Sequence, residues 1–219
     1  MDVLFLIVLI PALVDWVAVG RGLRPVERIA KPLTMIVLAA AAVTSWEGDY
    51  DVRFVATLVA VAASLAGDVF LMQERDLFLQ GLVSFFVAHV AYIAAFGGIE
   101  LTPYSVFIGT SLILISGPLF LVIRQGLRRR GREQLVPAVF GYCVVISVMV
   151  LTAMTSPGAD DWNRGAVFAA ASGALLFYAS DAMIGLTRFV RELTWAPVAI
   201  MVTYHLGQLG LVYALANGA

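Results

Sequence analysis

Two aspartates stand inside apolar stretches, where an ionised side chain is costly. Asp68 follows Gly67 in a run of Val, Ala and Leu, and Asp181 follows Ser180 in a second such run. A charged side chain near the centre of a bilayer costs about 2.5–3.5 kcal/mol on insertion scales, and such residues usually face the interior of a helix bundle at a functional site. We therefore predict that Asp68 and Asp181 are catalytic.

A pair of buried carboxyls is suited to acid/base chemistry. Burial and a second carboxylate nearby both oppose ionisation. If Asp68 and Asp181 face each other, one can hold a proton at neutral pH while the other is ionised, which is the arrangement that an acid and a base require. The alternative is a structural role for each, with Asp68 hydrogen-bonded to Ser64, four residues earlier, or to a serine on another helix.

Further polar side chains lie deep in the apolar runs. His89 has Tyr92 three residues later, on the same face of a helix, and His205 lies beside Tyr204 with Gln208 three residues later. Each histidine could instead form one structural hydrogen bond between helices. The HxxxH and HExxH spacings typical of zinc sites are not present, so we expect no metal.

Lys31 and Arg188 could supply positive charge near one membrane boundary. Arg188 lies two helical turns after Asp181, and Lys31-Pro32 stands at the predicted start of the second helix. These basic side chains either extend to the interface or bind phosphate. If they point inward, a cationic rim lies above an acidic, apolar cavity. Such a cavity fits an amphiphile with its phosphate at the surface and its alkyl chain between helices. Asp15, in the first run, reaches a similar depth.

Composition requires that membrane-spanning helices hold these residues. The chain has 219 residues, of which 61% are hydrophobic and 13% charged, so a soluble domain would lack polar surface. A helix needs about 20 mostly apolar residues to cross the hydrocarbon, and its backbone must satisfy its own hydrogen bonds there. Because the apolar runs are continuous and do not alternate, we predict an all-α polytopic bundle. The single cysteine, Cys143, is expected to be a packing residue.

Eight apolar runs divide the chain into predicted transmembrane helices. They cover roughly residues 2–20, 32–46, 52–73, 77–96, 104–124, 134–155, 162–187 and 194–216. The links are too short to separate domains, so residues 1–219 are predicted to form a single integral membrane domain. The first run lacks a preceding basic segment and a cleavage site, and is expected to be retained as a helix.

The basic residues predict the orientation of the helices. Of the 14 lysines and arginines, only Arg53 and Arg164 lie in even-numbered links. The odd-numbered links are therefore expected in the cytoplasm, with both termini outside. Asp68 and Asp181 then lie one to two turns short of the cytoplasmic surface.

A weak internal repeat accompanies the two aspartates. Asp68 is followed on the next predicted helix by His89, and Asp181 is followed in the same way by His205. Both copies enter the membrane in the same direction, so the repeat would be parallel. Sites in such proteins tend to lie where the two halves meet.

The order of several short motifs resembles the YhhN family of membrane lysoplasmalogenases. The motifs are Lys31-Pro32-Leu33, Gly67-Asp68 with Leu71, Gly81 to Phe85 to His89 to Tyr92, Tyr142, Phe177-x-x-Ser180-Asp181 with Arg188-Phe189, and Tyr204 with Gln208. Each motif is weak alone, but together they extend in order from the second helix to the last. The stretch from Tyr204 to Gln208 departs from the family pattern at His205.

The resemblance implies hydrolysis of the vinyl ether bond of lysoplasmalogens to a fatty aldehyde and a glycerophosphoethanolamine or glycerophosphocholine. We assign Asp181 as the acid and Asp68 as electrostatic stabiliser and base, and the reverse assignment stays open. Protonation of the alkene carbon and capture of the oxocarbenium ion by water require no cofactor. The predicted substrate-binding residues are Lys31, His89, Tyr92, Tyr178, Ser180, Arg188, Tyr204, His205 and Gln208.

Two other functions fit parts of the sequence. A proton-coupled transporter of lipids or small molecules also uses intramembrane carboxyls, but its usual sign, helices broken near mid-membrane, is weak here. An intramembrane aspartyl protease would need glycine at position 65, which is Leu65. We expect a multi-pass protein of the cell membrane whose partners are the bilayer and a lysophospholipid. No nucleic-acid surface is evident, and the site needs only one chain, which is compatible with a monomer.

Overall fold

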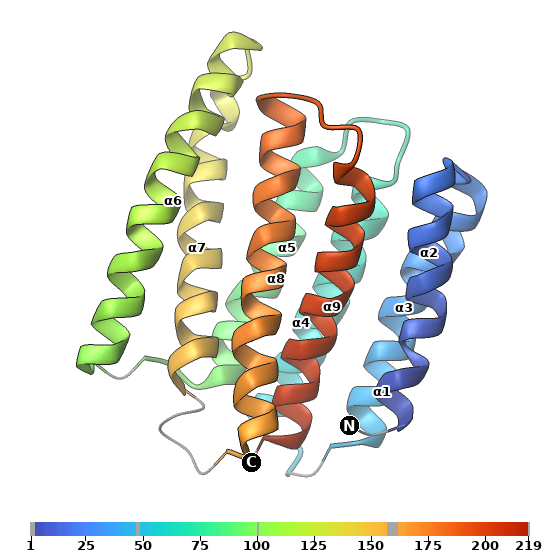
Figure 1. Ribbon diagram of the computed structural model, residues 1–219, viewed down its shortest axis with the longest axis vertical. Helices are drawn as coiled ribbons and strands as arrows, with labels where there is room; N and C mark the ends of the chain where they lie inside the picture. Colours follow the sequence, from blue (N-terminus) through green and yellow to red (C-terminus); the bar gives the residue numbers. More distant parts are fainter. Residues whose placement is uncertain (1–2, 47–48, 100, 157–161, 219) are drawn as a thin grey trace.

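The apolar runs form helices. The computed structural model describes residues 3–46, 49–99, 101–156 and 162–218, and within these ranges it contains helices and turns but no β-strand. The helices are α1 (Val3–Ile7), α2 (Leu9–Arg21), α3 (Arg24–Thr44), α4 (Val52–Leu71), α5 (Phe78–Phe96), α6 (Pro103–Arg129), the short 3-10 helix η1 (Glu133–Leu135), α7 (Val136–Thr155), α8 (Arg164–Phe189) and α9 (Ala196–Asn217). The predicted all-α bundle is confirmed (Figure 1).

Most of these helices are long and apolar enough to cross a membrane. Among the described residues, 7 segments meet this requirement, with α1 and α2 counted as one and η1 joined to α7. Helix α3 has 21 residues and runs alongside the others, although its first half is charged (Figure 1). The chain is therefore a multi-pass membrane protein. Helix α1 begins and α9 ends at the same end of the bundle. Which end faces the cytoplasm stays a prediction, and residues 1, 2 and 219 lie outside the described ranges.

The second helix begins earlier than the apolar pattern predicted. Helix α3 starts at Arg24 and has Pro25 in its first turn, where the N–H that proline lacks is not needed. Lys31-Pro32 therefore lies inside the helix, and the predicted start at this motif is wrong. The pattern missed the first turns because charged residues such as Glu27 lower the mean hydropathy there.

A proline interrupts the first span near its beginning. Helix α1 ends at Ile7 and α2 begins at Leu9. Proline has no N–H to bond the carbonyl four residues earlier, and its ring crowds that carbonyl. For Pro11 that carbonyl belongs to Ile7, where α1 ends. Pro11 alone therefore accounts for the break between α1 and α2.

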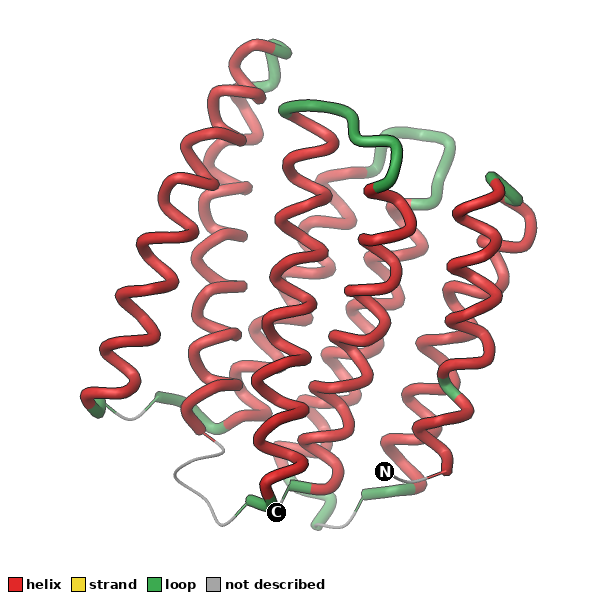
Figure 2. The backbone as a smooth tube through the Cα atoms, in the orientation of Figure 1, coloured by secondary structure: helices red, strands yellow, loops and turns green. Residues whose placement is uncertain are grey.

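Two helix pairs, α4 with α5 and α8 with α9, pack most closely. A Cβ atom on Gly67 would lie 2.6 Å from the Phe85 ring, and one on Gly207 would lie 2.8 Å from the backbone nitrogen of Phe177. Glycine at these positions allows the helices to approach. These are the pairs of the predicted repeat, and the loops that join each pair lie at the same end of the bundle (Figure 2), as a parallel repeat requires.

Candidate active site

Asp68, on α4, is buried and bonded by a tyrosine of α9. The residue is 3% exposed, and its Oδ2 accepts a hydrogen bond of 2.6 Å from the Tyr204 hydroxyl. Ser64, the partner considered from the sequence, instead accepts a hydrogen bond of 2.8 Å from Gln208 Nε2. Asp68 therefore connects its own helix to α9 and not to the preceding turn of α4.

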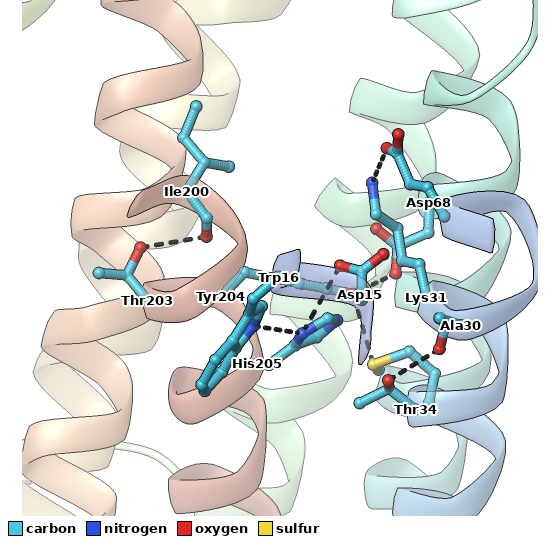
Figure 3. Close-up of polar contacts among 12 residues, drawn as sticks. Asp15, Trp16, Ala30, Lys31, Thr34, Asp68, Ile200, Thr203, Tyr204 and His205 are labelled. Atoms are coloured by element: carbon cyan, nitrogen blue, oxygen red, sulfur yellow. Dashed lines mark hydrogen bonds and ion pairs between the residues drawn. The ribbon is translucent and has the colours of Figure 1, made fainter. Parts of the chain in front are cut away.

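Lys31 and Asp15 lie beside Asp68 in one buried cluster (Figure 3). The Lys31 ammonium is 3.3 Å from a carboxylate oxygen of Glu27 and interacts electrostatically with Asp15 and Asp68. Asp15 is fully buried, and neither of its oxygens has a hydrogen-bond partner among the described residues. Among the described residues only Glu27 forms an ion pair with Lys31, while Asp15 and Asp68 lie within range of its charge, and the structure places Lys31 inside the bundle and not at its surface.

His205, on α9, contacts α2. Its Nδ1 accepts a hydrogen bond of 3.0 Å from the indole nitrogen of Trp16 and lies 4.0 Å from an oxygen of Asp15. Because Nδ1 accepts this bond, the neutral ring carries its proton on Nε2. That nitrogen has no partner among the described side chains. His205 therefore belongs to the cluster of Asp15 and Lys31 (Figure 3).

Asp181, on α8, is bonded by residues of α5 and α7. Its Oδ2 accepts a hydrogen bond from the Tyr142 hydroxyl and lies 3.4 Å from His89 Nε2. The same histidine nitrogen lies 3.0 Å from the Tyr142 oxygen. Tyr142 donates its single proton to Asp181. A proton on His89 Nε2 can therefore be donated either to the Tyr142 hydroxyl oxygen or to Asp181 Oδ2. Among the described contacts only Oδ2 is used, which leaves Oδ1 available to carry an acid proton.

Tyr142 is the main site residue to which the sequence assigned no role. It was part of the motif order, but its position in the chain says nothing about Asp181, because the two residues lie on different helices. Trp16, which bonds His205 from another helix, was missed for the same reason, whereas Glu27 lies four residues before Lys31 on α3, a spacing that the sequence itself shows. Only the packing of α7 against α8 brings the tyrosine hydroxyl to the carboxylate.

An apolar pocket lies beside Asp181. Its lining includes Asp181, Tyr142, Tyr178 and Cys143, and the remaining residues are mostly aliphatic or phenylalanine. The pocket extends to Phe78 and Phe189, where α5 begins and α8 ends. Its volume is about 70 Å³, room for several water molecules but not for an alkyl chain. Side chains must therefore move before a lipid can enter.

The two carboxyls do not form a direct pair. No hydrogen bond or ion pair joins Asp68 to Asp181 among the described side chains, and Asp68 does not line the pocket. Aromatic rings connect the two environments: Phe177 lies 5.4 Å from the Tyr204 ring and 4.8 Å from the His89 ring, measured between centroids. The arrangement in which the aspartates face each other is therefore not found.

Each aspartate nevertheless has a hydrogen-bond partner from the other helix pair, α4 with α5 or α8 with α9. Asp68 of α4 receives its proton donor, Tyr204, from α9, while Asp181 of α8 is approached by His89 of α5. Each aspartate is thus bonded across the boundary between the halves of the predicted repeat.

The other predicted binding residues have partners of their own. The Tyr92 hydroxyl donates to Gln208 Oε1, and the Ser180 hydroxyl donates to the Ile200 carbonyl at 3.2 Å. These bonds join α9 to α5 and to α8. The Tyr178 hydroxyl is 2.7 Å from the Ser116 hydroxyl at the wall of the pocket. Within the described ranges, no three acidic, histidine or cysteine side chains form a group that could hold a metal ion.

Comparisons with known proteins relate the chain to one family. The model of the YhhN family matches residues 26–215. Lysoplasmalogenase TMEM86A of Bos taurus is 32% identical over 156 residues, or 69% of this chain and 61% of that protein. Lysoplasmalogenase TMEM86B of Homo sapiens is 29% identical over 150 residues, or 68% of this chain and 58% of that protein. The chain thus spans about three fifths of the length of these relatives. No solved structure matches it.

Proposed function

Because the chain belongs to the YhhN family, we propose that it is a membrane hydrolase that cleaves the vinyl ether bond of lysoplasmalogens. The products are a fatty aldehyde and a glycerophosphoethanolamine or glycerophosphocholine. The relatives named lysoplasmalogenase support this substrate class. They give no support to a proton-coupled transporter. The observation that carries the proposal is the Asp181 carboxyl in the lining of an apolar pocket, with Tyr142 and His89 bonded to only one of its oxygens.

Asp181 is assigned as the general acid. In its protonated form it transfers the proton to the alkene carbon, and an oxocarbenium ion forms at the adjacent carbon. Water adds to that carbon, and the resulting hemiacetal releases the aldehyde and the glycerol hydroxyl. The proton lost by water restores the acid. Positioned acid/base groups of this kind contribute about 10²- to 10⁴-fold to rates.

Asp68 is assigned as an electrostatic stabiliser that acts together with Asp181, and the role of base passes to the Asp181 carboxylate, which recovers the proton from water. It does not line the pocket, so its effect on the reaction passes through Tyr204 and the rings of Phe85 and Phe177. Lys31 lies beside it in the buried cluster (Figure 3). The structure supports this role less directly than that of Asp181, because only Asp181 lines the pocket. Substitution of each aspartate tests the difference.

The test is aldehyde release from lysoplasmenylethanolamine by the detergent-purified protein, with an ester lysophospholipid as control. The wild type is expected to release aldehyde and to leave the ester intact. Asp181→Asn is expected to lower the rate by at least about 100-fold. A folded wild type that releases no aldehyde, or that hydrolyses the ester equally well, would contradict the proposal.

A further inference from the structure

An ionic group of three side chains lies at the loop end of the pocket. Asp76, in the α4–α5 link, accepts a hydrogen bond of 2.8 Å from Arg132 and a second one, through its other oxygen, from Arg188. The three side chains come from different parts of the chain: the α4–α5 link, the turn after α6 and the last turn of α8. All three are partly exposed, so a polar headgroup can reach them.

This group stands directly over the pocket lining. The Arg188 guanidinium lies 4.5 Å from the centre of the Phe78 ring and 6.0 Å from that of Phe189. Both rings line the pocket that contains Asp181. Arg188 follows Asp181 by seven residues on α8, which is a rise of about 10.5 Å along the helix. In a lysoplasmalogen three glycerol carbons and one oxygen separate the ether oxygen from phosphorus, which is a shorter span. The long Arg188 side chain can cover the difference, because side chains on a helix lean toward its N-terminus and thus toward Asp181.

The charges of the group complement a zwitterion. The Arg132 hydrogen bond holds the pKa of Asp76 below its usual value of 3.8, with a further contribution from the Arg188 charge, so the carboxylate is ionised at neutral pH. Two guanidiniums and one carboxylate leave one net positive charge. A phosphodiester carries one negative charge and matches the fork of hydrogen-bond donors on arginine. When the phosphodiester binds the two arginines, Asp76 loses its hydrogen bonds to them. Its carboxylate then requires another cation as partner.

We propose that Asp76, Arg132 and Arg188 form the headgroup site, in which the arginines bind the phosphate and Asp76 binds the ammonium group of ethanolamine. Asp76 thereby selects a zwitterionic lysolipid over an anionic lysolipid that lacks the amine. It repels the extra negative charge of the anionic lipid. Without a lipid, the same carboxylate holds the two guanidiniums at the pocket entrance. This inference rests on the proposed function, because the pocket must accept a lysophospholipid.

The test compares two vinyl ether substrates, the ethanolamine lysoplasmalogen and the corresponding alkenyl glycerol phosphate. The wild type is expected to prefer the ethanolamine substrate in kcat/KM. Asp76→Asn is expected to lower kcat/KM for that substrate about tenfold through KM, with kcat retained, and to leave the phosphate substrate unaffected or improved. Asp76→Glu keeps the charge and is expected to keep the preference.

The matched control is Glu133→Gln, which removes an exposed carboxylate 3.9 Å from Arg128 in the same loop region but outside the pocket lining. It is expected to behave as the wild type. If Asp76→Asn lowers kcat/KM equally for both substrates, or leaves the preference unchanged, Asp76 has no part in headgroup recognition and the inference is wrong.

Binding of alkyl ether analogues, which cannot be hydrolysed, separates this inference from the proposed function. Tighter binding of the ethanolamine analogue than of the phosphate analogue, lost in Asp76→Asn, supports the headgroup site even if the wild type releases no aldehyde. Aldehyde release together with equal binding of both analogues by the wild type would support the hydrolase and overturn the headgroup site.

Discussion

Each of the two intramembrane aspartates accepts a hydrogen bond from a tyrosine hydroxyl, but their surroundings are very different. Asp68 lies in a largely buried cluster with Asp15, Lys31 and the partly exposed Glu27, while Asp181 lines an apolar pocket and has an oxygen available. The residue type is the same at the two positions, and the sequence predicts a similar membrane depth for both. Access to a pocket is what distinguishes a carboxyl that can touch a substrate from one that acts through its neighbours.

Substitution of each aspartate by asparagine gives the largest expected effect and tests this comparison directly. Asp181→Asn is expected to lower kcat for aldehyde release by about 100-fold or more, because it removes the acid. Asp68→Asn is expected to lower it by about tenfold, because the charge acts only through Tyr204. Steady-state kinetics of both purified variants measures the difference. A loss in Asp68→Asn as large as in Asp181→Asn would show that Asp68 also reaches the substrate.

Removal of the buried cation tests the Asp68 region alone. Lys31→Met leaves buried carboxylates without their counter-charge and is expected to lower the free energy of unfolding by about 3–5 kcal/mol. The control, Arg28→Met, breaks an exposed ion pair of 3.0 Å with Glu74 and is expected to cost less than about 1 kcal/mol. Unfolding of the detergent-solubilised proteins measures both. Similar stabilities of the two variants would mean that the Lys31 cluster is hydrated and not closed.

A glycine substitution tests the contact between the two regions. Gly67→Ala places a Cβ atom 2.6 Å from the Phe85 ring, which lines the Asp181 pocket. Overpacking of this kind is expected to cost about 1–3 kcal/mol and to lower activity as the ring shifts. Gly141→Ala, whose Cβ would lie 4.0 Å from its nearest neighbour, Phe86, is the control. Unchanged stability and activity in Gly67→Ala would show that Phe85 moves freely.

The smallest expected effect concerns the pH dependence of Asp76. Its pKa is lowered in the folded protein, chiefly by the Arg132 hydrogen bond, so its contribution to stability is present above the unfolded pKa of 3.8 and is lost as pH falls through the folded pKa. The difference in melting temperature between wild type and Asp76→Asn is therefore expected to be constant from pH 7 to about pH 5 and to vanish in stronger acid. A difference that grows on acidification would contradict this assignment.

Much of the fold could be predicted because the bilayer imposes a simple length requirement. A run of about 20 apolar residues forms a helix in hydrocarbon whatever its neighbours are. The prediction was wrong at the start of α3, where the charged turns before Pro32 are helical although most of their side chains are exposed and only Ala30 and Lys31 are buried. Hydropathy averaged along the chain cannot detect a helix that extends beyond its apolar run.

The sequence by itself determined which side chains are too costly to be incidental: Asp68, Asp181 and the histidines that follow them, because a polar group in hydrocarbon requires a partner. Only the tertiary structure decided which partner each one has. Tyr142 and His89 meet Asp181, Tyr204 meets Asp68, and Arg188 meets Asp76 through contacts between helices. Such contacts depend on how each helix is rotated about its axis, and side-chain packing sets that rotation.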